Sequence, residues 1–195
     1  MNRPRFWLLL VLAVAAAASR VAPHPDNFSP LAAVALFGAA TFEHRRSAIL
    51  VPLGALLFSD LLLQLTYLAG WQARWGFYAG QWVVYTCILA TVGIGILLRS
   101  HRTIVTTALA TLASSLVFFL VTNLVWVYGA DSLYPKNLQG LMASYQAALP
   151  FFRNSLAGDV FYVTLLFGSL GLVEAYFPAI RADTPASDTT LAAAG

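Results

Sequence analysis

Long apolar runs separated by short polar stretches dominate this chain. A helix that crosses a bilayer needs about 20 mainly apolar residues, and most of the runs reach that length. The pattern therefore predicts an all-α integral membrane bundle of about six transmembrane helices. The expected segments are 6–19, 29–42, 47–69, 77–98, 103–127 and 158–178.

The second segment, 29–42, differs from the others. It is short for a spanning helix and follows Pro23, Pro25 and Pro30. Because proline interrupts regular helix, we expect this segment to be tilted, broken or partly re-entrant.

The two ends of the chain are also distinct. Residues 1–180 are expected to form one transmembrane domain, followed by a disordered tail at 181–195 that is rich in Ala, Thr and Asp. The first segment also has features of a cleaved signal peptide, since Arg3 and Arg5 precede an apolar stretch that ends in small residues. Its passage straight into a second apolar segment favours a retained helix.

Composition agrees with a membrane protein. The chain is 59% hydrophobic and only 10% charged, whereas soluble domains carry about 25% charged residues. Its net charge of +3 comes from small basic clusters between apolar runs. Because these clusters form no continuous basic surface, we exclude nucleic acid as a partner and expect membrane lipid instead.

The basic residues also predict orientation, because they are enriched in cytoplasmic loops. Placing both termini in the cytoplasm puts the larger basic set inside. That set is Arg3, Arg5, Arg45, Arg46, Arg99, Arg102 and Arg181, and the outer set is Arg20, Arg74, Lys136 and Arg153. The outer connections would then be 20–30, 70–76 and 128–157.

The last of these connections is unusually long, which is typical of functional loops. We expect a short interfacial helix or lid over 145–152, because Pro150 should prevent a longer helix.

Asp60 stands out within the third segment. An ionisable group at this depth is costly and normally faces a protein interior or an aqueous cavity. Gln64 and Tyr67 follow at helical spacing and share its face. The alternative is a buried structural partner for Asp60.

Aromatic and polar residues from other segments fall in the same outer half. Tyr78, Trp82 and Tyr85 form either a cavity-lining stripe or an interfacial aromatic belt. Together these groups predict an outward cavity for a flat or polyfunctional organic ligand. The expected ligand-binding residues are Asp60, Gln64, Tyr67, Tyr78, Trp82, Tyr85, Asn123, Trp126 and Asp159, with His24 and Arg153 at the rim or lid.

No catalytic, phosphate-binding or metal-binding motif is present, so we expect neither enzyme activity nor a cofactor. His24, His44 and His101 fall in three separate loops. His24 and Cys87 are the weak metal candidates, and Cys87 is otherwise a small core residue.

Ala13 and Ala17 form a small-xxx-small pair that allows close helix approach, either within the bundle or to a partner. With six helices in under two hundred residues, this AxxxA-type first helix and an outward polar pocket under long outer loops, the chain resembles the S components of energy-coupling factor vitamin transporters. The resemblance implies that Ala13 and Ala17 face a transmembrane coupling subunit, which works with ATPases, and that outer loops cap a vitamin.

Two further resemblances are narrower. The stretches PHPDNFSPLAAVALFGAA, LFSDLLL and YPKNLQGLMASYQAALPFFRNSLAGDVFY are similar to a family of uncharacterised bacterial membrane proteins, which implies the inner membrane. His24, Asp60, Tyr78 and Arg153 occur in the order seen in solitary cobalamin-specific S components. Cys87 departs from that order, because it follows Tyr78.

We therefore expect a substrate-binding subunit for uptake of a small organic micronutrient, with cobalamin as one example. Two alternatives stay open. One is a non-catalytic accessory or assembly protein that uses its small-residue first helix. The other is a membrane enzyme that uses Asp60, His24 and Asp159 on a lipid-like substrate.

Overall fold

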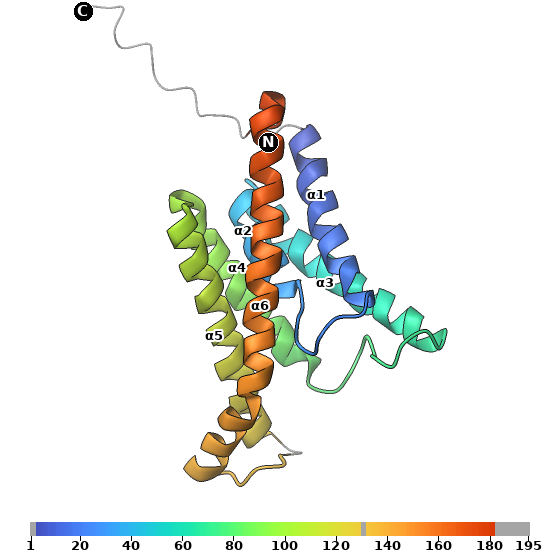
Figure 1. Ribbon diagram of the computed structural model, residues 1–195, viewed down its shortest axis with the longest axis vertical. Helices are drawn as coiled ribbons and strands as arrows, with labels where there is room; N and C mark the ends of the chain where they lie inside the picture. The colour runs from blue at the N-terminus through green and yellow to red at the C-terminus, as the bar shows by residue number, and fades with distance from the viewer. Residues whose placement is uncertain (1–2, 130–131, 182–195) are drawn as a thin grey trace, which may run out of the picture.

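The computed structural model describes residues 3–129 and 132–181, and within these residues the protein is helical without strands (Figure 1). This confirms the expected all-α class. The helices are α1 (Arg3–Ala18), α2 (Leu31–Thr41), α3 (Arg45–Leu68), α4 (Gln81–Leu98), α5 (Ile104–Tyr128) and α6 (Leu138–Tyr176), with short 3-10 turns at Ser19–Val21, Arg99–His101 and Pro178–Ile180.

Five of the helices are long and apolar enough to cross a membrane, which indicates a membrane protein, and α2 is the exception. Its 11 residues span only about 16 Å of a hydrocarbon layer about 30 Å thick. The expected shortness of the second segment is thus confirmed. Helix α2 alone therefore does not span the layer, and irregular backbone beside it at membrane depth is tolerated only where protein covers it.

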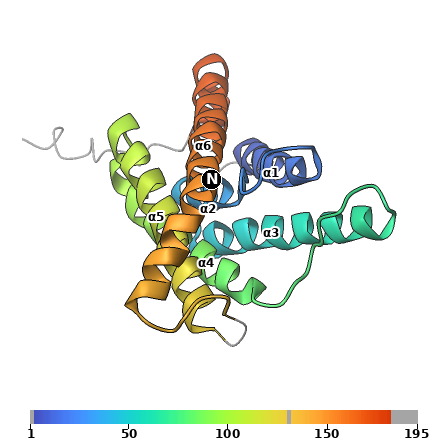
Figure 2. The ribbon, with the colours of Figure 1, turned by 60° about the horizontal axis from the view of Figure 1, so that its bottom comes forward.

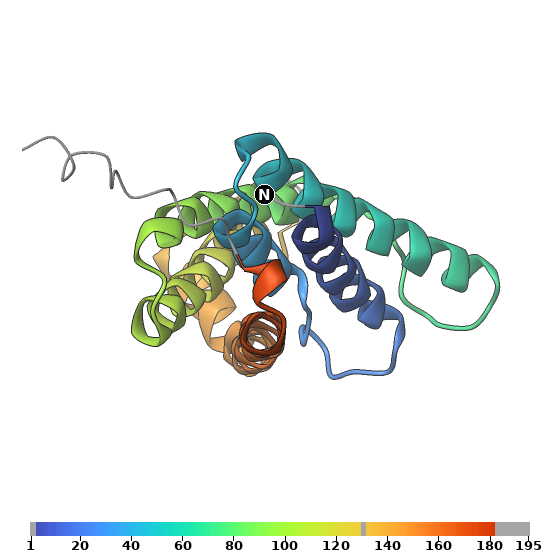
Figure 3. The ribbon, with the colours of Figure 1, turned by 90° about the horizontal axis from the view of Figure 1, so that it is seen from above.

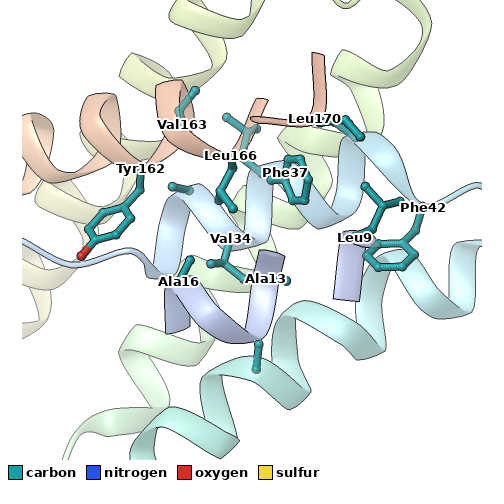
Figure 4. Packing of buried hydrophobic residues seen from close by; sticks show 14 of the residues in the cluster. Leu9, Ala13, Ala16, Val34, Phe37, Phe42, Tyr162, Val163, Leu166 and Leu170 are labelled. Carbon is teal, nitrogen blue, oxygen red and sulfur yellow. The ribbon is translucent and has the colours of Figure 1, made fainter. Parts of the chain in front are cut away.

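Helix α2 lies at the centre of the bundle, where it contacts every other α-helix (Figure 3). All of residues 33–41 are buried. The helix is built largely of alanine and glycine, and small side chains let neighbouring helices approach closely. Phe37 and Val34 then fill the remaining space against α6 and α1 (Figure 4).

Helix α1 is part of the same core. The side chains of Leu9, Ala13 and Ala17 are fully buried (Figure 4 shows Leu9 and Ala13). Ala13 and Ala17, expected as a partner interface, therefore serve packing within the chain, and this face is closed to a coupling subunit in the structure. The Ser19 Oγ and Tyr162 Oη atoms, 2.8 Å apart, connect the end of α1 to α6.

The expected loop over 128–157 is wrong, because α6 begins at Leu138 and runs for 39 residues. The Asn137 side chain accepts a hydrogen bond from the Gly140 N–H and caps its start. Pro150 lies inside the helix, where it removes one backbone hydrogen bond and bends the helix without ending it. Figure 2 shows the first part of α6 inclined to the rest.

The end of the bundle that carries the N-terminus also carries the end of α6 (Figure 1). There the buried Arg5 guanidinium pairs with Glu174 and so ties α1 to α6. The Arg99 guanidinium donates to the backbone oxygens of Ala39, at 2.8 Å, and Glu43, at 2.9 Å. It thereby satisfies a carbonyl at the end of α2. Of the predicted tail, residues 182–195 lie outside the described residues.

Two glycines of α4 test the close packing around α2. A Cβ atom on Gly95 would lie 2.6 Å from the Ala39 Cβ, whereas one on Gly93 would meet nothing within 4 Å. We expect Gly95→Ala to destabilise the protein by about 1–3 kcal/mol through overpacking. Gly93→Ala should be neutral or slightly stabilising, because alanine favours helix. Thermal unfolding in mild detergent measures both, and equal melting temperatures would contradict this packing.

Candidate ligand-binding site

A cavity of about 650 Å³ lies between the start of α4, the second half of α5 and the first half of α6. The segment before α2 contributes Asn27, which adopts a positive φ of 61° that asparagine tolerates better than most residues. All these parts belong to the end of the bundle opposite the N-terminus (Figure 1). The lining side chains that the argument uses are Tyr78, Trp82, Ser115, Phe119, Asn123, Trp126, Phe151 and Phe152.

Aromatic rings from three helices or their flanking segments line the cavity, and contacts across α5 and α6 hold part of this wall in place. The Phe119 ring centroid lies 4.7 Å from that of Phe152 and 5.3 Å from that of Tyr145. The Tyr145 hydroxyl also donates to the Leu120 backbone oxygen at 2.9 Å. The residues expected as an interfacial helix or lid thus form the bent first part of α6 and close one side of the cavity.

A few polar groups interrupt this aromatic wall. The Asn123 amide donates to the Phe119 oxygen at 2.8 Å and accepts from the Ser144 hydroxyl at 3.3 Å. Each amide group keeps a further hydrogen-bonding position. Burial, followed by the Asp60 carboxylate, raises the pKa of Tyr78, so its phenol stays neutral at pH 7 and can donate or accept. Such sparse polar groups fix the orientation of a bound molecule.

Four of the residues expected to bind ligand line this cavity, namely Tyr78, Trp82, Asn123 and Trp126. Sequence reasoning missed Phe119, Phe151 and Phe152, because phenylalanine in a membrane helix is as common against lipid as in a cavity. It also missed Ser115. A Ser or Thr in a membrane helix commonly bonds its own backbone, and Ser115 does so at the Thr111 oxygen.

Asp60 lines neither cavity that the structure describes and is instead the centre of a hydrogen-bond network. Its buried carboxylate accepts from Arg20 at 2.6 Å on one oxygen, and from Gln81 at 2.6 Å and Tyr85 at 2.9 Å on the other. Gln81 also donates to the Gly76 oxygen at 3.1 Å. The network joins α3 to the start of α4, directly behind the cavity wall made by Tyr78 and Trp82.

Gln64 supports the same connection, since its side-chain oxygen accepts from the Gly76 N–H at 3.2 Å. A side chain at Gly76 would not fit, because a Cβ there would lie 1.9 Å from the Asp60 backbone oxygen. Tyr67, also on α3, stacks at 5.8 Å against Trp75. These residues shape the α3–α4 connection and do not reach the main cavity.

His24 lies in a second, smaller cavity of about 180 Å³, together with Arg20 and Arg74. The Arg74 guanidinium approaches the His24 ring at 2.7 Å and pairs with the exposed Asp26 at 3.1 Å. Arg153 is exposed on α6 and lines neither cavity. His24, Asp60 and Asp159 thus have separate partners and form no common acid–base site.

Cys87 is buried in α4 and lines neither cavity, so it does not meet His24. Within residues 3–129 and 132–181, no cluster of three or more His, Cys, Asp or Glu side chains is arranged to hold a metal ion.

Asp159 is buried near the middle of α6, and its Oδ2 atom lies 2.6 Å from the Ser115 Oγ. Ser115 lines the main cavity, whereas Asp159 does not, so the carboxyl group lies directly behind this part of the cavity wall. The described ion pairs join Arg5 to Glu174, Arg20 to Asp60 and Arg74 to Asp26, and none of them involves Asp159.

The fold and the cavity together define a polytopic α-helical membrane protein with an open cavity at one end of its bundle. The family of unknown function DUF6580 matches residues 1–180, and the chain belongs to that family. Neither a comparison with curated proteins nor one with solved structures gives a match.

Two acidic residues provide a matched test of the Asp60 network. Arg20, Gln81 and Tyr85 all donate hydrogen bonds to Asp60. In Asp60→Asn the side-chain NH₂ group must therefore face a donor in either orientation of the amide: Arg20 in one, Gln81 and Tyr85 in the other. We expect Asp60→Asn to lower the free energy of unfolding by about 3–5 kcal/mol, because a buried ion pair is broken. Asp26 pairs with Arg74 and is 74% exposed, so Asp26→Asn should lower the free energy of unfolding by less than about 1 kcal/mol.

Thermal unfolding in detergent of Asp60→Asn, Asp26→Asn and the unchanged protein measures this difference. A melting temperature for Asp60→Asn that equals that of Asp26→Asn would show that the Asp60 network does not hold α3 to α4.

Proposed function

We propose that this protein is a membrane-embedded binding subunit that captures a small organic micronutrient in the cavity between α4, α5 and α6. The observation that carries the proposal is the cavity itself, about 650 Å³ in volume and walled by aromatic rings with a few amide and hydroxyl groups. Ligand sites in proteins commonly measure about 300–1,000 Å³ and combine these same features.

The chemistry of the wall indicates the shape of the ligand. Trp82 and Trp126 come from different helices, and flat rings bind by stacking on such side chains. Asn123 and Tyr78 supply a donor and an acceptor each, which suits a heteroaromatic ring with polar substituents.

Cobalamin fits this site less well than a smaller vitamin-like molecule. His24, the candidate cobalt ligand nearest the outer end, lies in the separate smaller cavity. Cys87 is buried in α4 away from both cavities. We therefore favour a flat organic micronutrient that needs no protein ligand to a metal.

The direction of binding follows from the distribution of basic residues. With both termini in the cytoplasm, the cavity end faces outward across a bacterial inner membrane. We propose binding without covalent chemistry, as in the S components that the chain resembles. Inward movement would need a coupling subunit with ATPases, or rotation of the whole bundle. Because Ala13 and Ala17 are buried, such a subunit would contact other surfaces.

Native mass spectrometry of the protein, purified in mild detergent from its own host, tests the proposal with two tryptophan variants. Trp82 lines the cavity, whereas Trp71 lies in the α3–α4 connection and lines neither cavity. Both side chains are largely exposed, at 65% and 82%, so neither variant should prevent folding. We expect an adduct of vitamin-like mass that binds about tenfold more weakly in Trp82→Ala and unchanged in Trp71→Ala.

An adduct retained equally in both variants would place the ligand elsewhere. Absence of any adduct, followed by no tryptophan quenching with a panel of vitamins, would contradict the proposal and favour an accessory protein.

A further inference from the structure

Asp159 is a buried acid directly behind Ser115, a residue of the cavity wall, and none of the described ion pairs involves it. Its side chain is only 6% exposed, and its helix neighbour in the site, α5, carries no charged residue. Among the described residues, the only hydrogen-bond partner of its carboxyl group is the Ser115 hydroxyl. An ionised carboxylate with one partner at this depth would be costly.

The hydrogen bond from Ser115 engages only one oxygen of the Asp159 carboxyl group among the described residues. The Ser115 Oγ atom donates to the Asp159 Oδ2 at 2.6 Å and lies 3.0 Å from the Thr111 backbone oxygen. A proton on the Asp159 Oδ1 atom makes the buried group neutral and leaves the hydrogen bond from Ser115 in place. Without a bound cation, Asp159 is then a neutral acid.

The surrounding charges leave this arrangement undisturbed. Helices α2 and α5, which pack on α6, contain no Asp, Glu, Lys, Arg or His. On α6 itself the charged residues are Arg153, which is exposed, and Glu174, which pairs with Arg5 of α1. In the segment before α2, Asp26 and His24 both contact Arg74.

The rings above this acid favour positive charge as well. A cation over the face of an aromatic ring is attracted by the ring electrons, most strongly by tryptophan. Trp82, Trp126 and Phe119 line the same cavity as Ser115. A buried acid beneath several aromatic rings is the combination that binds an organic cation.

We propose that the cavity selects a ligand with a positively charged nitrogen, which Asp159 neutralises by giving up its proton. This inference rests on the proposed function and names the substrate class. When the cation enters, the O–H bond of Asp159 breaks and the proton passes to water in the cavity. The Ser115 hydroxyl keeps its hydrogen bond to the new carboxylate. One ligand charge enters and one proton leaves, so the net charge of the site is unchanged.

A charged and an uncharged ligand of the same shape test the proposal on the full-length protein in detergent. The probes are N-methylquinolinium, a permanent cation, and quinoline, with affinity measured by tryptophan quenching. We expect the cation to bind about tenfold more tightly than quinoline or better at pH 7. Its affinity should rise with pH, and binding should release one proton per cation into weakly buffered solution, whereas quinoline should release none.

Asp159→Asn is the decisive variant because its amide is uncharged like the neutral acid, and the amide oxygen can accept the hydrogen bond from Ser115. It should fold as well as the unchanged protein and bind quinoline equally. The preference for the cation, the proton release and the pH dependence should all disappear. Asp26→Asn, at the exposed acid of the smaller cavity, is the control and should keep all three.

The outcomes separate the two proposals. Equal affinity for both probes in the unchanged protein, or a cation preference that survives in Asp159→Asn, would overturn the role of Asp159 while leaving the ligand cavity intact. Failure of both probes and of every vitamin tested to quench tryptophan would overturn both proposals.

Discussion

Hydrocarbon offers no hydrogen-bond partner, and this constraint governs how the bundle is built. Each polar side chain inside it needs a partner from the chain itself. Asp60 is an example, because its two oxygens accept hydrogen bonds from Arg20, in the turn after α1, and from Gln81 and Tyr85 of α4. One buried carboxylate of α3 thereby joins these two elements to α3, whose second half stands apart from the bundle (Figure 2).

The short α2 is the second consequence of the same constraint. A central helix of 11 residues cannot cross the bilayer alone, so its flanking backbone must be covered by other helices. Gly158 makes this possible on α6, where a Cβ would lie 3.0 Å from the Ser29 backbone nitrogen. Arg99 performs the equivalent role at the other end, where it binds the Ala39 carbonyl. The segment that carries Asn27 is held in place in this way and becomes part of the cavity wall.

Hydrophobic pattern predicted α3, α4 and α5 to within a few residues, because each is a long apolar run bounded by polar or glycine-containing turns. It failed at α6, where Pro150 and nearby polar residues resemble a loop in sequence but form a bent helix packed on α5. Part of the cavity lining was predictable, namely Tyr78, Trp82, Asn123 and Trp126. The partner of Asp60 was not, since Arg20 lies in a distant turn and only the folded chain brings it within 2.6 Å.

The depth of the cavity has an electrical consequence. Ser115 lies near the middle of α5, so a solvent-filled cavity brings the solution on the cavity side roughly halfway through the membrane. The potential difference across the bilayer then falls mainly over the other half of the bundle. A full crossing is worth about 2.3 kcal/mol per unit charge for each 100 mV. A charged molecule seated beside Ser115 has therefore already crossed part of that field, and the voltage of the cell itself contributes to how fully the site is occupied.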